Sequence, residues 1–130
     1  MIKTKSVHSP IEADDGLRIL ATRLRGRGLP VSRYDVWMAN LGPSETLLKG
    51  MLSGKLAWSD FAKRYRDEIF QSASLDKSNR TIKNHGQKFT LRLLQELGRR
   101  GNVTLMCHCA EGEPHCHRHV LAKILRGKIG

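Results

Sequence analysis

The sequence predicts a small α/β domain of three layers, α/β/α, with helices on both sides of a short and mainly parallel sheet. The best strand is the nearly continuous apolar run Val103–Cys107, which is typical of a central strand buried on both faces. A helical pattern precedes this strand at 87–100, and another follows it after Pro114. Helix, buried strand, turn and helix in succession indicate a parallel sheet covered by helices. With 130 residues, the chain has the length of one domain, residues 1–130.

Shorter patterns predict the remaining strands. Residues 2–7 alternate apolar and polar side chains, as expected of a short strand near an edge of the sheet. Residues 34–39 predict a second strand around an apolar Val-Trp pair. Residues 17–24 suit a short helix and a buried strand equally well. The basic segment 25–30, with two glycines and a proline, is expected to be a flexible loop.

Apolar periodicity and capping signals predict the helices. Ser44 is placed to cap a helix that ends near 53–54, and a second helix starts near 59–60. The third helix is expected over 87–100, after a polar surface loop at 71–86. The predicted apolar stripes are Phe61, Tyr65 and Ile69 in the second helix, Phe89, Leu93, Leu94 and Leu97 in the third, and Val120, Leu121, Ile124 and Leu125 in the last.

Composition sets limits on localisation and partners. No apolar stretch approaches the length of a membrane span and no targeting segment is recognisable, so we expect a cytoplasmic protein with no membrane partner. The formal net charge of +11 attracts polyanions and makes a nucleic-acid-binding module one alternative function. Aromatic residues make up only 5% of the chain and no recognised nucleic-acid-binding motif appears, so this alternative is less favoured.

Chemistry is concentrated in the turn 107–119, which holds all three cysteines and four of the six histidines. Cys107 and Cys109 are two residues apart, so they point to the same side of an extended chain. Cys116 and His119 are three apart and share one face of a helix. Cysteine and histidine side chains arranged in this way are the usual ligands of tetrahedral zinc. The predicted metal ligands are therefore Cys107, Cys109, Cys116 and His119, with His115 or His117 as replacements for His119.

The same turn also suits thiol catalysis or anion binding. In open α/β sheets, ligands bind beyond the carboxyl ends of the strands, where the next helix offers free N–H groups. Near such a helix start the pKa of Cys116 is expected to fall, which makes its thiolate a candidate nucleophile. His117 is a candidate catalytic acid or base, and Arg118 is a candidate donor to an anion. A cluster of reduced thiols and histidines without any function is the simpler alternative.

Three common signatures of phosphate or redox chemistry are absent from the sequence. No cysteine is followed six positions later by an arginine, as in a common phosphatase loop. The glycine-rich phosphate-binding loop and the Cys-x-x-Cys redox motif are also missing. A strained redox pair formed by Cys107 and Cys109 stays a further alternative.

A series of short motifs runs through the whole chain. They are Asp15-Gly16, Arg18-Ile19-Leu20, Arg23-Leu24, Arg27-Gly28, Trp37, Leu41 with Pro43-Ser44, Trp58 with Phe61 and Tyr65, Thr104-Leu105 and Cys116-His117-Arg118. On these residues, and in this order, the chain resembles the family called domain of unknown function 488 (DUF488), the YeaO-like proteins. The resemblance implies a Rossmann-like α/β domain and no established activity. It also implies an anion pocket with an aromatic wall, built from Arg23, Arg27, Trp37, Ser44 and the corner 116–118.

The leading hypothesis is a small enzyme or ligand-binding domain with an anion or metal site in the turn 107–119. Zinc is the expected cofactor if a metal is bound, and an anionic small molecule is the expected partner. The alternatives are a basic nucleic-acid-binding module and a structural or interaction protein that has no site of its own. The sequence leaves open whether the protein is an enzyme, and it predicts no oligomeric state.

Overall fold

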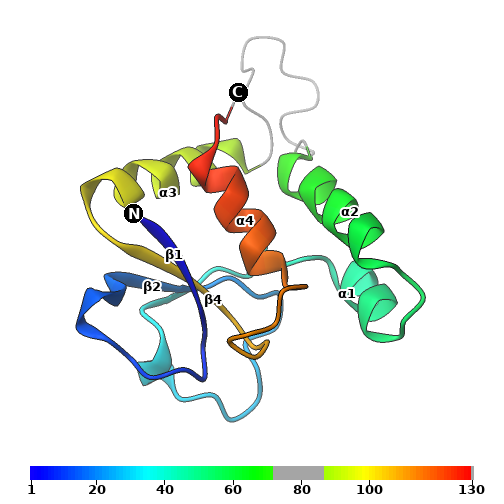
Figure 1. Ribbon diagram of the computed structural model, residues 1–130, viewed down its shortest axis with the longest axis horizontal. Coiled ribbons are helices and arrows are strands. Elements are labelled where there is room, and N and C mark those ends of the chain that lie inside the picture. The colour runs from blue at the N-terminus through cyan, green and yellow to red at the C-terminus, as the bar shows by residue number, and fades with distance from the viewer. Residues whose placement is uncertain (72–86, 130) are drawn as a thin grey trace.

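Four parallel strands form the sheet of the computed structural model, which describes residues 1–71 and 87–129 (Figure 1). The strands are β1 (Ile2–Ser6), β2 (Leu17–Leu20), β3 (Val36–Trp37) and β4 (Val103–Cys107). Their order in the sheet is β1-β4-β2-β3, and every pairing is parallel. The predicted α/β class and parallel sheet are therefore confirmed. So are the central, fully buried position of β4 and the edge position of β1.

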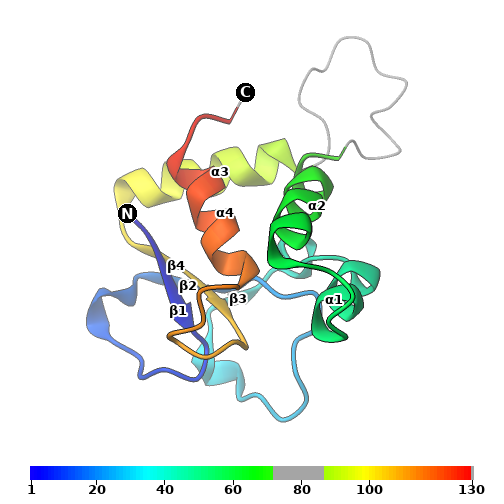
Figure 2. The same cartoon turned by 45° about the vertical axis from the view of Figure 1, so that its right-hand side comes forward.

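Four α-helices contribute to the hydrophobic core on one face of this sheet. They are α1 (Glu45–Leu52), α2 (Trp58–Phe70), α3 (Lys88–Arg100) and α4 (His117–Arg126). Both ribbon views place α2, α3 and α4 on the same side of the strands (Figures 1 and 2). One hydrophobic core joins side chains of all four helices to the sheet residues that face the helices, among them Ile19, Val103 and Leu105. The carboxyl end of β4 points toward the start of α4, which is where the cysteines lie.

In the described part of the chain, the opposite face of the sheet is covered by segments that contain no α-helix. Leu20 and Met106 point away from the helices and join Val7 and Leu29 in a second, smaller hydrophobic cluster, against which Tyr34 packs. The segments over this face contain the short 3-10 turns η1 (Ala13–Asp15) and η2 (Val31–Arg33); a third turn, η3 (Ala39–Leu41), precedes α1. The third layer of the domain therefore consists of loops and 3-10 turns in place of α-helices.

Several local predictions are confirmed. Ser44 is the N-cap of α1 and accepts a hydrogen bond from the Leu47 backbone N–H at 3.2 Å. The stripe Phe61, Tyr65 and Ile69 of α2 is buried.

The segment 17–24, which suited either a helix or a strand, contains the strand β2. Its pairing with both β3 and β4 decided the conformation, because local periodicity favoured neither form.

The predicted apolar stripe of α3 is wrong in part. Phe89 and Leu93 are more than half exposed, whereas the buried positions are Leu91, Leu94 and Gly98. A Cβ atom on Gly98 would lie 2.5 Å from Cδ1 of Ile2, so the missing side chain lets β1 and α3 approach closely. The contact with β1 therefore decides which face of α3 is buried. The spacing of apolar residues every four positions does not by itself reveal that face.

Two boundaries also differ from the sequence-based expectation. The last helix begins at His117, with Cys116 as N-cap, and not at Pro114. Strand β3 has only two residues, Val36 and Trp37, within the predicted range 34–39. Most of the predicted loop 71–86 lies outside the described residues. In the part of the chain that the structure describes, no helix has the length and apolar character needed to span a membrane.

One buried ion pair lies beneath the edge of the sheet. Nζ of Lys5 is 2.6 Å from Oδ1 of Asp15, and both side chains are almost inaccessible to solvent. Glu12 and the Pro10 carbonyl accept the other two hydrogen bonds of this ammonium group. Burial opposes ionisation of Asp15, but hydrogen bonds from the Glu12 backbone and from Lys5 outweigh it and lower the Asp15 pKa. The pair thus attaches the segment 10–15 to β1.

Replacing Asp15 by Asn should destabilise the fold by about 3 kcal/mol at neutral pH, because Lys5 then stays buried with its main counter-charge removed. The folded-state pKa of Asp15 lies below its unfolded value, so its contribution is complete above about pH 4 and is lost as the pH falls through the folded-state value. Urea unfolding at several pH values measures both effects. The matched control is Asp14→Asn, whose exposed pair with Lys3 should contribute less than about 1 kcal/mol. Equal losses for the two variants would contradict this assignment.

Candidate functional site

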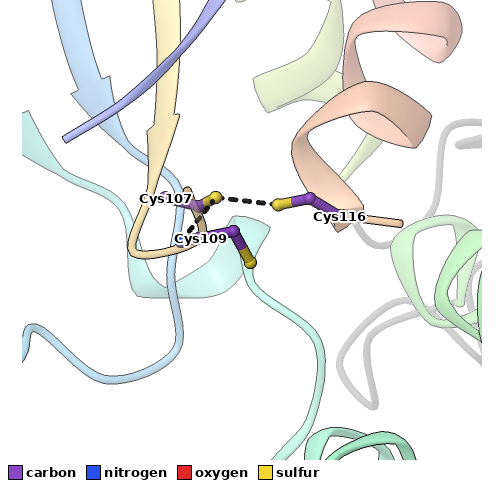
Figure 3. Close-up of side chains that lie close together, drawn as sticks. All are labelled: Cys107, Cys109 and Cys116. Atoms are coloured by element: carbon purple, nitrogen blue, oxygen red, sulfur yellow. Dashed lines mark hydrogen bonds between the residues drawn. The ribbon is translucent and has the colours of Figure 1, made fainter. Parts of the chain in front are cut away.

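The three cysteines converge where β4 ends and α4 begins. Cys107 is the last residue of β4, Cys109 lies in the following turn, and Cys116 is the N-cap of α4. Their three sulfur atoms all lie within 4.8 Å of one another, and Cys107 and Cys116 approach to 2.7 Å between sulfurs (Figure 3). The backbone N–H of Cys109 also donates to the Cys107 sulfur at 3.3 Å. A strand end and a helix start therefore bring together thiols that are up to nine positions apart.

A buried arginine holds this turn in place. The side chain of Arg118 is completely inaccessible to solvent, and its Nη1 lies 2.9 Å from the Cys107 sulfur and 3.3 Å from the Cys109 carbonyl oxygen. Its Nη2 donates to the carbonyl oxygens of Ala110 and Glu111, both at 3.0 Å. Among the described residues, Nε of Arg118 has no hydrogen-bond partner. The guanidinium group thus points into the turn and away from solvent.

The charge of Arg118 requires a negative partner, because an unpaired charge is very costly to bury. Among the residues that the structure describes, the only carboxylate within 4 Å is that of Glu111, which is 3.8 Å away and more than half exposed. The nearest candidate for a negative group is the Cys107 sulfur. The positive charge of Arg118 therefore favours a thiolate within the cluster.

The three thiols differ in protonation. Hydrogen bonds from the Cys107 and Cys116 thiols lower the pKa of Cys109 well below its ordinary value, with the charge of Arg118 acting in the same direction. Hydrogen bonding with Cys107 and Cys109 raises the pKa of Cys116, and hydrogen bonding with Cys109 raises the pKa of Cys107. The predicted lowering of the Cys116 pKa by the helix start is therefore wrong. Cys109 is also partly exposed, whereas Cys107 and Cys116 are buried.

His117 lies beside the cysteines as a neutral ring. Its Nε2 is within hydrogen-bond distance of the Ala21 carbonyl oxygen, which accepts only, so Nε2 carries the proton. Its Nδ1, then free of a proton, faces the Cys116 sulfur at 4.0 Å. Burial lowers the pKa of His117, and the edge of the ring packs against Tyr65, which itself donates to the Leu41 carbonyl at 2.6 Å. The unprotonated Nδ1 thus faces the thiol cluster as a hydrogen-bond acceptor.

A cavity of about 440 Å³ opens beside these groups. Cys107, Cys109 and His117 form one part of its wall. Most of the remaining wall is apolar. It is completed by Thr22, Arg23, Leu24, Gly26, Pro43, Leu48, Leu52 and His108. A small molecule bound in this space would therefore lie against the partly exposed Cys109.

The other histidines of the turn are placed apart from the sulfurs. Within the described residues, the group with metal-ligand spacing contains the three cysteines and not His119. The His119 Nε2 is 3.0 Å from the Glu113 carbonyl oxygen, and the His115 ring stacks on Trp58. His108 lies on the opposite side of the turn, with Nε2 3.2 Å from the Leu24 carbonyl oxygen. Three of the four predicted metal ligands are thus together, and the role of His119 as the fourth stays a prediction.

The residues of the predicted anion pocket do not meet at one point. Arg23 lines the cavity but donates to the carbonyl oxygens of Gly42 and Pro43. The Trp37 indole N–H donates to the Thr22 carbonyl, and Ser44 is occupied as the cap of α1. Arg27 lines a neighbouring cavity, and Arg118 is enclosed by the turn. Arg118 and Ser44 therefore support the fold of the site more directly than they face a ligand.

Sequence reasoning found the cluster but not its most accessible thiol. The spacing of Cys107 and Cys109 signalled that they share a side, yet only burial distinguishes the partly exposed Cys109 from the enclosed Cys116. The contribution of Tyr65 was also missed. Its place in an apolar helical stripe marks it as a core residue, and nothing local indicates its contact with His117.

Comparisons with known proteins agree with this picture of the chain. The model of the family DUF488-N3a, described as the active DUF488-N3 subclade, matches residues 2–128. Uncharacterised proteins from Mycobacterium bovis and from two strains of Mycobacterium tuberculosis are each 27% identical to the chain over 129 residues. These alignments cover 98% of this chain and 95% of each relative. No solved structure matches the chain.

Alkylation of the native protein should distinguish the three thiols. We expect iodoacetamide to modify Cys109 first, and to do so well below pH 8.5, where an ordinary thiol is mostly protonated. Cys107 and Cys116 should react only after unfolding, because both are buried. Peptide mass spectrometry across a pH series measures the order and the pH profile. Preferential modification of Cys116 in the folded protein would contradict the assignment.

Proposed function

The chain belongs to the DUF488 family, within its DUF488-N3a subclade, and we propose that it is a small enzyme that uses a cysteine thiolate as its nucleophile. The family assignment specifies no reaction, so the proposal rests on the geometry of the site. The observation that carries it is the fully buried Arg118, whose Nη1 contacts the Cys107 sulfur at 2.9 Å. A permanent buried positive charge at this place favours the thiolate over the thiol at neutral pH.

Cys109 is the nucleophile in this proposal. It is the partly exposed member of the cluster, it lines the cavity, and its pKa is lowered. In the reaction, a lone pair of the Cys109 sulfur forms a bond to an electrophilic atom of a substrate in the cavity, and the leaving group departs with the electrons of the bond that breaks. The neighbouring Cys107 and Cys116 thiols, together with the charge of Arg118, lower the pKa of Cys109. The neutral His117 faces the Cys116 sulfur with its unprotonated Nδ1 at 4.0 Å.

A thiolate metal site is the second candidate, favoured by the grouping of three cysteine sulfurs within 4.8 Å. Cys107, Cys109 and Cys116 would hold a soft ion such as zinc, and Arg118 would offset the negative charge that three thiolates bring to a divalent ion. Bound zinc would supply Lewis-acid chemistry at this position. The donor set fits the metal, and a fourth ligand would come from the side of the cavity or from His119.

Removal of the buried positive charge tests the first candidate. Arg118→Met removes one of the causes that lower the Cys109 pKa, so it should raise that pKa and slow the alkylation of Cys109 at pH 6 by at least about tenfold. Arg118→Lys keeps the charge and should retain most of the reactivity, which separates the charge from the packing of the turn. Arg126→Met, in the same helix but bonded to the Ile2 carbonyl, is the matched control and should leave the alkylation profile unchanged. An unshifted profile in folded Arg118→Met would refute the thiolate proposal.

Metal content separates the two candidates. Elemental mass spectrometry of the untagged protein, purified without chelator, should find less than about 0.1 equivalents of zinc if the free thiolate is the functional form. About one zinc per chain, lost in Cys109→Ser and retained in His115→Ala, would favour the metal site. His115 serves as control because it stacks on Trp58 outside the sulfur group.

A further inference from the structure

A second cavity, of about 580 Å³, adjoins the thiol pocket and has a strongly basic wall. Its lining includes two arginines and two histidines, and among the described residues that line it none is acidic. The lining residues are His8, Gly26, Arg27, Gly28, Leu29, Pro30, Arg33 and His108. The side chains thus combine two permanent positive charges with two imidazole rings that can donate hydrogen bonds. This combination attracts an anion.

Parts of this wall are rigidly held. The Arg33 guanidinium donates to the carbonyl oxygens of Val7 and Ser9, at 3.0 and 2.9 Å, and this anchors it between two loops. Arg25 donates to the Tyr34 hydroxyl and to the Leu29 carbonyl, so the basic segment 25–30 is attached to the smaller hydrophobic cluster. The position of Arg33 and the course of this segment are therefore established by the fold before any ligand binds.

His108 and Gly26 form the boundary between the two cavities, since both residues line both of them. The backbone of Gly26 has φ +92°, and a Cβ atom there would lie 2.7 Å from the His108 ring. The His108 ring therefore packs directly on the Gly26 backbone. His108 immediately precedes Cys109 in the chain. A ligand held in the basic cavity would extend past His108 to reach the thiol pocket.

We propose that the substrate is a small phosphate monoester with an apolar body, which places its phosphate among His8, Arg27 and His108 and its body against Cys109. Phosphate suits this wall because it offers several acceptor oxygens and close to two negative charges to convergent donors. The apolar body suits the thiol pocket, whose wall includes Leu24, Leu48 and Leu52. The proposal names the substrate class of the thiolate enzyme proposed above and rests on that function.

Phenyl phosphate, an aromatic phosphate monoester, is the probe for this site. We expect saturable changes in the ring signals of His8 and His108 when it is titrated into Cys109→Ser protein and followed by nuclear magnetic resonance. Arg27→Gln should weaken the affinity by about tenfold or more, because a charged hydrogen bond is lost. Lys123→Gln makes the same change of charge at an exposed position of α4, so it should alter the affinity by less than about twofold.

Three results would overturn the phosphate site: no saturable change at the two histidines, equal weakening by the two glutamine variants, or binding of a single-stranded oligonucleotide but not of phenyl phosphate. The Cys109→Ser background makes these results independent of thiol reactivity. In the wild-type protein, phenyl phosphate should also slow the alkylation of Cys109 by neutral iodoacetamide. Binding without such protection would overturn the link between the two cavities, whereas failure of the thiolate proposal is detected by the alkylation profile without phosphate.

Discussion

The contact between the buried Arg118 and the Cys107 sulfur is the interaction on which the site depends. The guanidinium group bonds three successive carbonyl oxygens, of Cys109, Ala110 and Glu111, and so determines the path of the chain between β4 and α4. The same group places a positive charge against the thiols. One side chain therefore provides both the shape of the turn and the electrostatic condition for a thiolate, and a substitution there affects both.

The parallel sheet explains why the reactive groups gather at one edge. The carboxyl ends of β2 and β4 lie side by side, so the turn after β4 meets the segment that follows β2. His117 reaches the Ala21 carbonyl across this junction, and His108 packs on Gly26. The helices supply the apolar support from one side, and the basic segment 25–30 lies beside the junction. Thiol pocket and basic cavity are thus two parts of one strand-end region.

Much of the fold follows from local sequence. The apolar run Val103–Cys107 is unambiguous because a central parallel strand is buried on both faces, and the N-cap at Ser44 depends only on neighbouring residues. Local sequence left the conformation open, or predicted the wrong face, where a distant contact decided the outcome. The strand at 17–20 depends on its pairing with β4, and the buried face of α3 depends on the approach of Ile2 to Gly98.

For the site, the sequence by itself determined the inventory and the place: three cysteines and their neighbouring histidines, at a strand-to-helix turn. Only the tertiary structure decided their roles. Hydrogen bonding lowers the pKa of Cys109 and raises the pKa of Cys116, and packing leaves Cys109 partly exposed while it encloses Arg118. The physical reason is that spacing along the chain sets which side chains can meet, whereas protonation and exposure depend on charges and packing contributed by segments far away in sequence.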